Sequence, residues 1–232
     1  MDFRDKHVVI TGGTGALGIA VVGALLAQGA TCHVPYRSDA EAERFPHRGN
    51  RQVALVALGD LADEAAVMRF YDGLSLWASI HIAGTFAFAP IEKSDKAVLV
   101  GQLESNLVST YLCCRAAVAA FRRGASGGRI VNVASRQGAE PRQGANLTAY
   151  TAAKAGVAAL TAALGEEVAK DGILVNAVAP SLMDTPANRK SMPDADYAAW
   201  PKVEEVAATI VYLASPQNTV ARGGVVPVYG RV

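Results

Sequence analysis

The sequence has few aromatic residues and almost no excess of charge of either sign. Aromatics make up 6% of its 232 residues, and 22 Lys and Arg residues nearly balance 21 Asp and Glu residues, for a formal net charge of +1. A chain so close to neutral has no overall field that would attract nucleic acid or an anionic membrane surface. No apolar run reaches the roughly 18 residues that a membrane-spanning helix needs. We therefore expect neither a nucleic-acid nor a membrane partner.

Cysteine is scarce as well. The three cysteines are Cys32, Cys113 and Cys114. An odd number without the spacing of metal ligands argues against a disulfide framework and against a zinc site. Residues 1–6 lead directly into an apolar strand and do not resemble a signal peptide. These features predict a reduced, cytoplasmic protein that binds no metal.

Apolar residues make up 51% of the chain and gather in short runs. Runs rich in β-branched residues predict buried strands, at residues 7–10, 31–36, 52–58, 76–82, 129–134, 173–178 and 225–228. Helical segments separate the strands, with a polar loop expected at 136–146 and irregular chain at 188–200; the longer helices are expected at 63–74, 96–123 and 202–214. This alternation predicts a single-domain α/β fold over residues 1–232, a doubly wound parallel sheet with helices on both faces.

The first strand runs into a glycine-rich segment that opens a helix. Glycine permits the tight turn and lets backbone N–H groups approach a pyrophosphate, while the helix N-terminus favours its negative charge. This context predicts a dinucleotide-binding loop, with a plain strand-to-helix turn as the alternative. The residues expected to bind the cofactor here are Gly12, Thr14, Gly15, Ala16, Leu17 and Gly18.

The second strand ends in Arg37 and Ser38, where many dinucleotide-binding proteins carry an acid for the ribose 2′-hydroxyl. A guanidinium suits a 2′-phosphate, and Ser38 adds a hydroxyl. We therefore expect NADP(H) in preference to NAD(H). Asp39 comes late for the acidic role and is expected to begin the next helix.

Further cofactor contacts are expected after the third and fourth strands. Asp60, followed by Leu61, either accepts a hydrogen bond from an adenine amino group or caps the helix at 63–74, and the sequence leaves both open. Ala83 and Gly84 are small residues at the end of a strand, where the carboxyl edge of the sheet needs room for a ligand. His81 suits a structural role as well as a catalytic one.

Tyr150 and Lys154 stand four residues apart in a helical run, so both side chains lie on one helix face. A phenol has an unperturbed pKa of about 10, and a nearby ammonium is expected to lower it. Tyr150 would then exchange a proton with a substrate oxygen that Ser135 holds, while Asn106 anchors a water leading to Lys154. A chance pair on a solvated helix face is the alternative.

Taken together, these segments resemble the short-chain dehydrogenase/reductase family over nearly the whole chain. The resemblance implies a nicotinamide-dependent oxidoreductase with a seven-stranded Rossmann-like sheet and a small-molecule carbonyl or alcohol substrate. It also implies a homodimer or homotetramer formed through the helices that bear Asn106 and Tyr150. The residues that carry it are the loop from Thr11 to Gly18, Asp60, Ala83, Gly84, an Asn–Ser–Tyr–Lys tetrad (Asn106, Ser135, Tyr150 and Lys154), and Pro180 and Thr185, with cofactor contacts expected at Tyr150, Lys154, Pro180 and Thr185.

The chain departs from the family pattern at four places. Gly15 precedes Ala16, where the family usually places its middle glycine, and His81 with Ile82 replaces a pair of asparagines. The segment between Ser135 and Tyr150 is longer than usual, so we expect it to bulge. Ser181 follows Pro180 where glycine is common.

Residues 184–200 and the loop 12–18 are also similar to dihydropteridine reductases, which suggests a substrate lid at about 184–201. Those enzymes generally lack the catalytic serine and use NADH through an acid, whereas this chain has Ser135 and Arg37. We expect an NADP(H)-dependent carbonyl oxidoreductase. The alternatives are a quinonoid dihydropteridine reductase and, from another class, a non-catalytic regulator that senses NADP(H).

Overall fold

The computed structural model describes residues 1–124 and 127–231. Its strands form one sheet in the order β3-β2-β1-β4-β5-β6-β7, and every neighbouring pair is parallel. The fold prediction is therefore confirmed. The strands are β1 (His7–Thr11), β2 (Thr31–Tyr36), β3 (Val53–Ala57), β4 (Ala78–His81), β5 (Gly128–Val133), β6 (Ile173–Pro180) and β7 (Val225–Val228).

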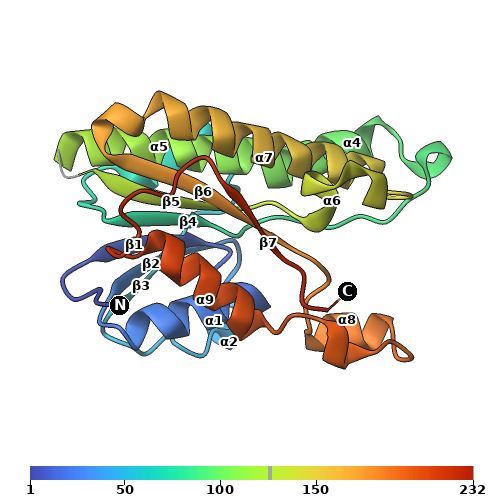
Figure 1. Ribbon diagram of the computed structural model, residues 1–232. Coiled ribbons are helices and arrows are strands. Elements are labelled where there is room, and N and C mark those ends of the chain that lie inside the picture. The colour runs from blue at the N-terminus through green and yellow to red at the C-terminus, as the bar shows by residue number, and fades with distance from the viewer. Residues whose placement is uncertain (125–126, 232) are drawn as a thin grey trace.

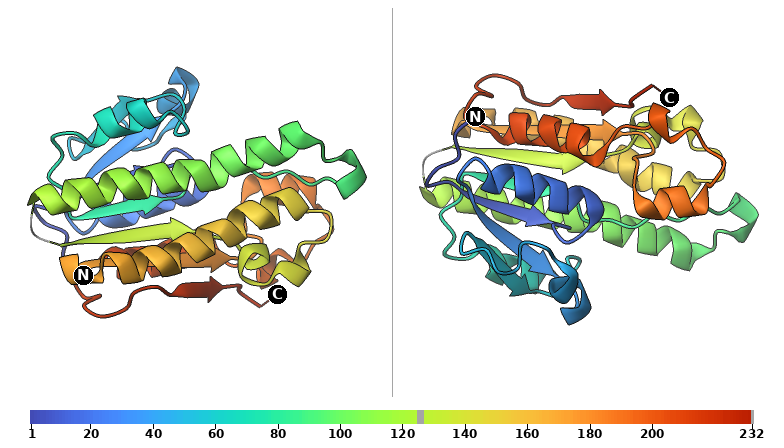
Figure 2. Two further views of the ribbon diagram at one scale, coloured as in Figure 1. Left: turned by 90° about the horizontal axis from the view of Figure 1, so that it is seen from above. Right: turned by 90° about the horizontal axis from the view of Figure 1, so that it is seen from below.

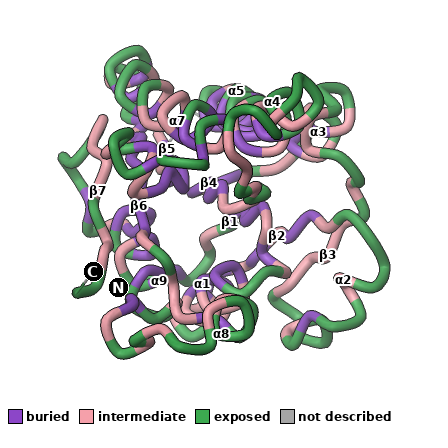
Figure 3. The backbone as a smooth tube through the Cα atoms, turned by 90° about the vertical axis from the view of Figure 1, so that its right-hand side faces the viewer, coloured by how far each residue is buried: buried purple, intermediate pink, exposed green. Residues whose placement is uncertain are grey.

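Helices cover both faces of the sheet, as Figures 1 and 2 show. One face carries α3 (Glu64–Tyr71), α5 (Ser109–Gly124) and α7 (Thr148–Glu167). The other carries α1 (Ala16–Leu26), α2 (Asp39–Arg44) and α9 (Val203–Ala214). The strands are thus shielded on both sides, which explains why their sequences read as continuous apolar runs. Buried backbone runs through the middle of the molecule between these layers (Figure 3).

The direction in which the chain adds strands to the sheet reverses between β1 and β4. From β1 the chain builds outward through β2 and β3, then returns to add β4 and the later strands on the other side of β1. Such a reversal leaves a crevice at the carboxyl ends of the two strands, where open α/β sheets bind ligands. The segments that follow β1, β2, β4 and β5 converge on this edge.

Three segments differ from the sequence expectation. The helix expected at 96–123 is divided into α4 (Lys96–Gln102), a π-helical turn (Leu103–Val108) and α5. The polar loop after β5 contains α6 (Arg136–Ala139) and a 3₁₀ turn (Pro141–Gln143), and the irregular stretch contains α8 (Pro186–Ser191) and a 3₁₀ turn (Tyr197–Ala199). Side chains just before the two short helices explain their formation, because Ser135 caps α6 and Thr185 caps α8. Two further 3₁₀ turns are Ile91–Lys93 and Ala169–Asp171.

Within the described chain, the three cysteines are free and buried. Burial raises the pKa of the Cys32 and Cys113 thiols to about 12, so both stay protonated near neutral pH. In the same part of the chain, none of the helices has both the length and the apolar character needed to cross a bilayer.

His81, at the end of β4, belongs to a buried hydrogen-bonded network and is 2% exposed. Its Nδ1 lies 2.8 Å from Asn132 Oδ1, and its Nε2 lies 2.8 Å from Ser79 Oγ. The Ser79 hydroxyl is in turn 2.8 Å from that of Tyr71. Burial lowers the pKa of His81 to about 4, so the ring is neutral near pH 7. Of the two roles that the sequence left open, the structure favours the structural one.

This network predicts an acid-sensitive fold. Between pH 6.5 and 4 an unfolded chain protonates His81 and the folded chain does not, so stability falls as the pH falls, by up to about 3 kcal/mol. Urea unfolding of His81→Gln, which keeps a donor and an acceptor but cannot titrate, should show a correspondingly smaller loss over this range. An equal loss in both proteins would assign the acid sensitivity to other groups.

Candidate active site

Two adjoining cavities, of about 430 and 190 Å³, lie at the carboxyl edge of the sheet and share Leu17, Ile82, Gly84, Thr85 and Met183 in their walls. Most of the residues that the sequence predicted for the site line one or the other of these two cavities. The larger cavity is lined by Gly12, Thr14, Gly15, Ala16, Leu17, Gly18, Arg37, Asp60, Leu61, Ala83 and Gly84. The smaller one is lined by Asn106, Ser135, Tyr150, Lys154 and Pro180.

The glycine loop packs so closely that side chains are excluded at two of its positions. Gly12 has a φ of +68°, and a Cβ there would lie 2.7 Å from Ala83 N. A Cβ on Gly18 would lie 2.1 Å from Gly12 O. Helix α1 begins directly behind the loop, with Gly15 at its N-cap position. The backbone N–H groups in the first turn of α1, which have no partner within the helix, therefore lie at the end of α1 nearest the larger cavity. This arrangement fits a pyrophosphate.

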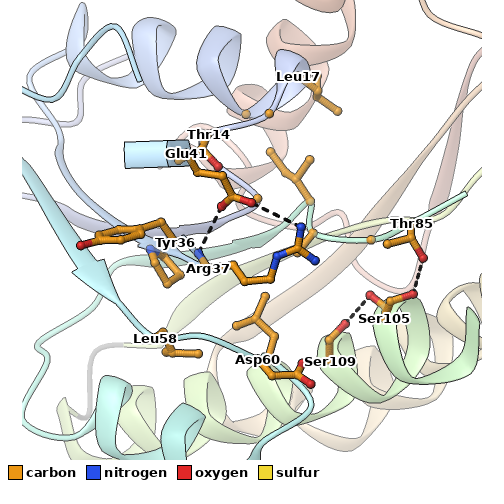
Figure 4. A pocket seen from close by; sticks show the side chains of 18 of the residues that line it. Thr14, Leu17, Tyr36, Arg37, Glu41, Leu58, Asp60, Thr85, Ser105 and Ser109 are labelled. Atoms are coloured by element: carbon orange, nitrogen blue, oxygen red, sulfur yellow. Dashed lines mark hydrogen bonds and ion pairs between the residues drawn. The ribbon is translucent and has the colours of Figure 1, made fainter. Parts of the chain in front are cut away.

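The far end of the larger cavity holds Arg37 at the end of β2. Its guanidinium is 3.6 Å from a carboxylate oxygen of Glu41, and its backbone N–H donates to the other oxygen at 3.1 Å (Figure 4). Arg37 is thus placed as the sequence predicted, but paired with an acid from α2. Ser38 does not line the cavity; it occupies the N-cap position of α2, which begins at Asp39 as expected.

Asp60 lines the larger cavity, and its Oδ1 accepts a hydrogen bond from the Ala62 N–H at 2.8 Å. The cap of α3 is Asp63, whose Oδ1 accepts from Ala66 N–H at 3.0 Å. The capping alternative for Asp60 is therefore wrong, because the sequence contains a second acid at the true N-cap. The contact with a cofactor stays the prediction for Asp60, because this residue lines the larger cavity.

Lys154 reaches the smaller cavity from α7 and is only 5% exposed. Its Nζ donates to Val133 O, at the end of β5, at 2.7 Å. Burial lowers the pKa of Lys154 to about 8, because removing an ammonium from water disfavours the charged form.

Asn106 lies in the π-helical turn and is fully buried. Its Nδ2 donates to Thr85 O and Gln102 O, each at 3.0 Å, whereas its Oδ1 has no hydrogen-bond partner within the described chain. A Cβ added to Gly84 would lie 2.4 Å from this Oδ1 and 3.5 Å from Lys154 Nζ. Asn106 Oδ1 and Lys154 Nζ therefore both lie close to Gly84, and the water expected between Asn106 and Lys154 stays a prediction.

Tyr150 and Ser135 complete the wall of the smaller cavity. Burial raises the pKa of the Tyr150 phenol, and the Ser135 hydroxyl opposes part of that rise. The expected lowering by Lys154 is therefore wrong for the protein alone, since desolvation outweighs any effect of an amine that is itself buried. Ser135 Oγ also accepts the Gly138 N–H at 3.0 Å, which fixes the direction of its side chain.

Sequence reasoning missed part of the lining, and two of the residues that it expected at the cofactor, Ser38 and Thr185, line neither cavity. The Thr185 hydroxyl accepts the Asn188 N–H at the start of α8. Glu41, which sequence reasoning missed, stands four residues after Arg37 and pairs with it, although Arg37 precedes the start of α2. Other missed side chains come from loops, from the π-helical turn or from the start of α5 and left no pattern, among them Thr85, Phe86, Ser105, Ser109 and Met183.

The arrangement combines an elongated cavity on a helix N-terminus with a compact cluster of a phenol, a hydroxyl, an amide and an amine. The first part fits the phosphates and adenosine of a dinucleotide. The second can hold a polarised oxygen and pass it a proton.

Comparisons with known proteins agree with this architecture. The family profile "short chain dehydrogenase" matches residues 6–196, and the chain belongs to this family of oxidoreductases. It is 33% identical to a galactitol 2-dehydrogenase of Rhizobium johnstonii, covering 96% of this chain and 93% of that one. It is 30% identical to 3beta-hydroxysteroid dehydrogenase 1 of Eggerthella lenta, covering 96% and 91%. The solved structure of ElxO with NADP bound superposes with a TM-score of 0.88 at 23% identity, over 97% of both chains.

The site geometry makes Gly84→Ala a test of the packing around Asn106. The new methyl would overlap Oδ1 of a side chain that two hydrogen bonds hold, so we expect a loss of about 1–3 kcal/mol in unfolding free energy. Gly101→Ala is the matched control, because a Cβ there has nothing within 4 Å and lies in α4. It should be neutral or stabilising by about 0.5–1 kcal/mol. Equal unfolding free energies for the two variants in urea would contradict the described packing.

Proposed function

We propose that the protein is an NADP(H)-dependent oxidoreductase that interconverts a small-molecule ketone and alcohol, with Tyr150 as the proton donor and acceptor. The observation that carries this proposal is the smaller cavity. Tyr150, Ser135, Lys154 and Asn106 surround it, and it shares five wall residues with the cavity at the glycine loop. A proton donor thus stands beside the place where a dinucleotide fits.

A nicotinamide cofactor, when bound, supplies the hydride or takes it up. The backbone of the glycine loop, Asp60 and Arg37 would hold its adenosine and phosphates, and Lys154 its nicotinamide ribose. In reduction Ser135 donates a hydrogen bond to the carbonyl oxygen, and the Tyr150 phenol gives that oxygen a proton as the carbon gains a hydride. The products are an alcohol and a Tyr150 phenolate, which recovers its proton through Lys154 and a water on Asn106. Oxidation reverses each step.

The raised pKa of Tyr150 bears on the direction of the reaction. Near neutral pH the phenol of the described protein holds its proton, which suits the acid of a reduction better than the base of an oxidation. Lys154, with a pKa of about 8, exchanges a proton readily in the same range.

Arg37 supports NADP(H) as the preferred cofactor, because a guanidinium binds a phosphate through paired charge-assisted hydrogen bonds. The NADP in the ElxO structure is consistent with that choice. NAD(H) is the alternative, and Glu41 beside Arg37 is the feature that favours it.

The wall beside Tyr150 suits a neutral substrate. The Phe86 ring packs edge-on against the Tyr150 ring, with centroids 5.1 Å apart. Leu17 and Met183 line the same cavity, and Lys154 is the one charged side chain among its described wall residues. An apolar group beside the reacting carbonyl would bury surface here, whereas a carboxylate would lose hydration next to a Lys154 ammonium that already donates to Val133 O.

The segment 184–201 is proposed as the substrate lid. It is closed at its base by a hydrogen bond from Asp184 N–H to Pro201 O at 2.9 Å. Asp184 also binds Arg189 of α8 through two contacts of 2.6 and 2.7 Å, and the Arg189 guanidinium lies 4.8 Å from the Tyr197 ring centroid. The similarity of this segment to dihydropteridine reductases keeps pteridine reduction as the second candidate activity.

We also propose that the protein forms a homo-oligomer, and exposed apolar side chains support this proposal. Four large apolar side chains between the start of α4 and the first turn of α5 are exposed: Leu99, Val100, Val108 and Tyr111. They lie on the helical region that contains Asn106, through which the family resemblance implies a homodimer or homotetramer.

Tyr150→Phe separates the enzyme from a regulator that only binds the cofactor. Removing the hydroxyl should lower kcat for any accepted ketone by about 10²–10⁴-fold, because proton transfer to the oxygen is lost. NADPH affinity, measured by fluorescence titration, should change by less than about threefold, or ~0.7 kcal/mol. Tyr212→Phe, which removes an exposed phenol on α9, is the control and should retain full turnover. Wild-type turnover by Tyr150→Phe would refute the assigned role.

A substrate panel tests the proposed substrate and its rival together. With NADPH, acetophenone should give a kcat/KM at least about tenfold above that of 4-acetylbenzoate, which adds only a carboxylate. Quinonoid dihydropterin, offered with NADPH and with NADH, should be reduced at background rate. Faster reduction of the pterin than of any ketone would favour the dihydropteridine reductase. NADPH binding without turnover of any substrate would favour the regulator.

A further inference from the structure

Glu41 holds Arg37 in a double contact. Its Oε2 accepts the Arg37 backbone N–H at 3.1 Å, and its Oε1 lies 3.6 Å from the guanidinium (Figure 4). The Glu41 side chain is 26% exposed and the Arg37 side chain 73% exposed, so the carboxylate is the more anchored partner. The cation expected to bind a 2′-phosphate is therefore already occupied by an acid of the same chain.

The charge of the larger cavity strengthens this conflict. Among its described wall residues, Arg37 is the cation, and Glu41 and Asp60 are carboxylates. A phosphate monoester brings a further charge of about −1.5 to −2 near pH 7. The phosphate gains Arg37 but meets Glu41 at the same place, and like charges in a partly desolvated cavity repel.

A 2′-hydroxyl meets the same pair without that conflict. A hydroxyl is a donor, and the Glu41 carboxylate is an acceptor that keeps its contact with the Arg37 N–H. The unphosphorylated ribose therefore leaves the ion pair intact. NADP(H) and NAD(H) differ only at the 2′ position. The Arg37–Glu41 pair therefore affects the ratio of their affinities.

We propose that Glu41 is a specificity-determining residue that restrains the preference of this protein for NADP(H) over NAD(H). The inference rests on the proposed nicotinamide cofactor and on Arg37 as the 2′-phosphate ligand. The charge of Glu41 opposes the phosphate directly and also holds the guanidinium that binds it. Wild-type protein accordingly binds both cofactors, with a smaller preference for NADPH than Arg37 alone would give.

The test is Glu41→Gln, which removes the charge and keeps an oxygen that can accept the Arg37 N–H. In fluorescence titrations of the whole chain with NADPH and with NADH, the ratio of their dissociation constants should shift toward NADPH by at least about tenfold. Glu43→Gln is the matched control, because it removes the same charge from the exposed side of the same helix. It should leave the ratio within about twofold of wild type, or ~0.4 kcal/mol.

A second variant locates the effect. In an Arg37→Ala background, Glu41→Gln should raise NADPH affinity less than it does in wild type, because the freed cation is gone. An unchanged cofactor ratio in Glu41→Gln, with both cofactors binding wild type, would overturn the role of Glu41 alone. If wild type binds neither cofactor, the proposed function itself fails, and the role of Glu41 with it.

Discussion

The candidate site depends on an amine that the fold has taken out of water. Lys154 is almost fully buried, with its Nζ bonded to the carbonyl of Val133 at the end of β5. Removing a cation from water is costly, and here the cost appears as a pKa lowered to about 8. The π-helical turn places Oδ1 of Asn106, which has no hydrogen-bond partner among the described residues, close to the same glycine as Lys154 Nζ, Gly84. The fold thus holds a readily exchanged proton beside Tyr150, which lies one helical turn from Lys154.

Different electrostatic effects dominate at the two ends of the site. Near Tyr150 desolvation dominates, so the phenol keeps its proton and the amine releases one readily. Near Arg37 the groups are exposed enough for ion pairing to dominate, and Glu41 on α2 balances the guanidinium. Substitutions at one end can therefore leave the other end unaffected. Tyr150 and Lys154 belong to α7, whereas Arg37 and Glu41 belong to the β2–α2 segment.

The sheet was predictable from sequence because buried parallel strands require continuous apolar runs, and β2 and β7 have the predicted bounds. The positions of the glycine loop and of the Tyr150–Lys154 pair at the two cavities were predictable because both features are defined by local spacing. The pKa of Tyr150 was not, since it depends on burial by Phe86 and other residues distant in the chain. The start of α8 at Pro186 was missed because a single cap by Thr185 begins it, and the π-helical turn at Asn106 was missed because it interrupts an otherwise continuous helical pattern. The pairing of Glu41 with Arg37 was visible only in its i,i+4 spacing, which many surface pairs share.

The central claim is that the larger cavity places a hydride carrier against a carbonyl that Tyr150 protonates. The most direct measurement is isotope transfer to a neutral ketone that the protein reduces, from NADPH in which both hydrogens at C4 of the nicotinamide are deuterium. The account predicts one deuterium on the carbinol carbon of the alcohol for each cofactor oxidised. Cofactor oxidation without deuterium in the alcohol, or deuterium released to solvent, would contradict it.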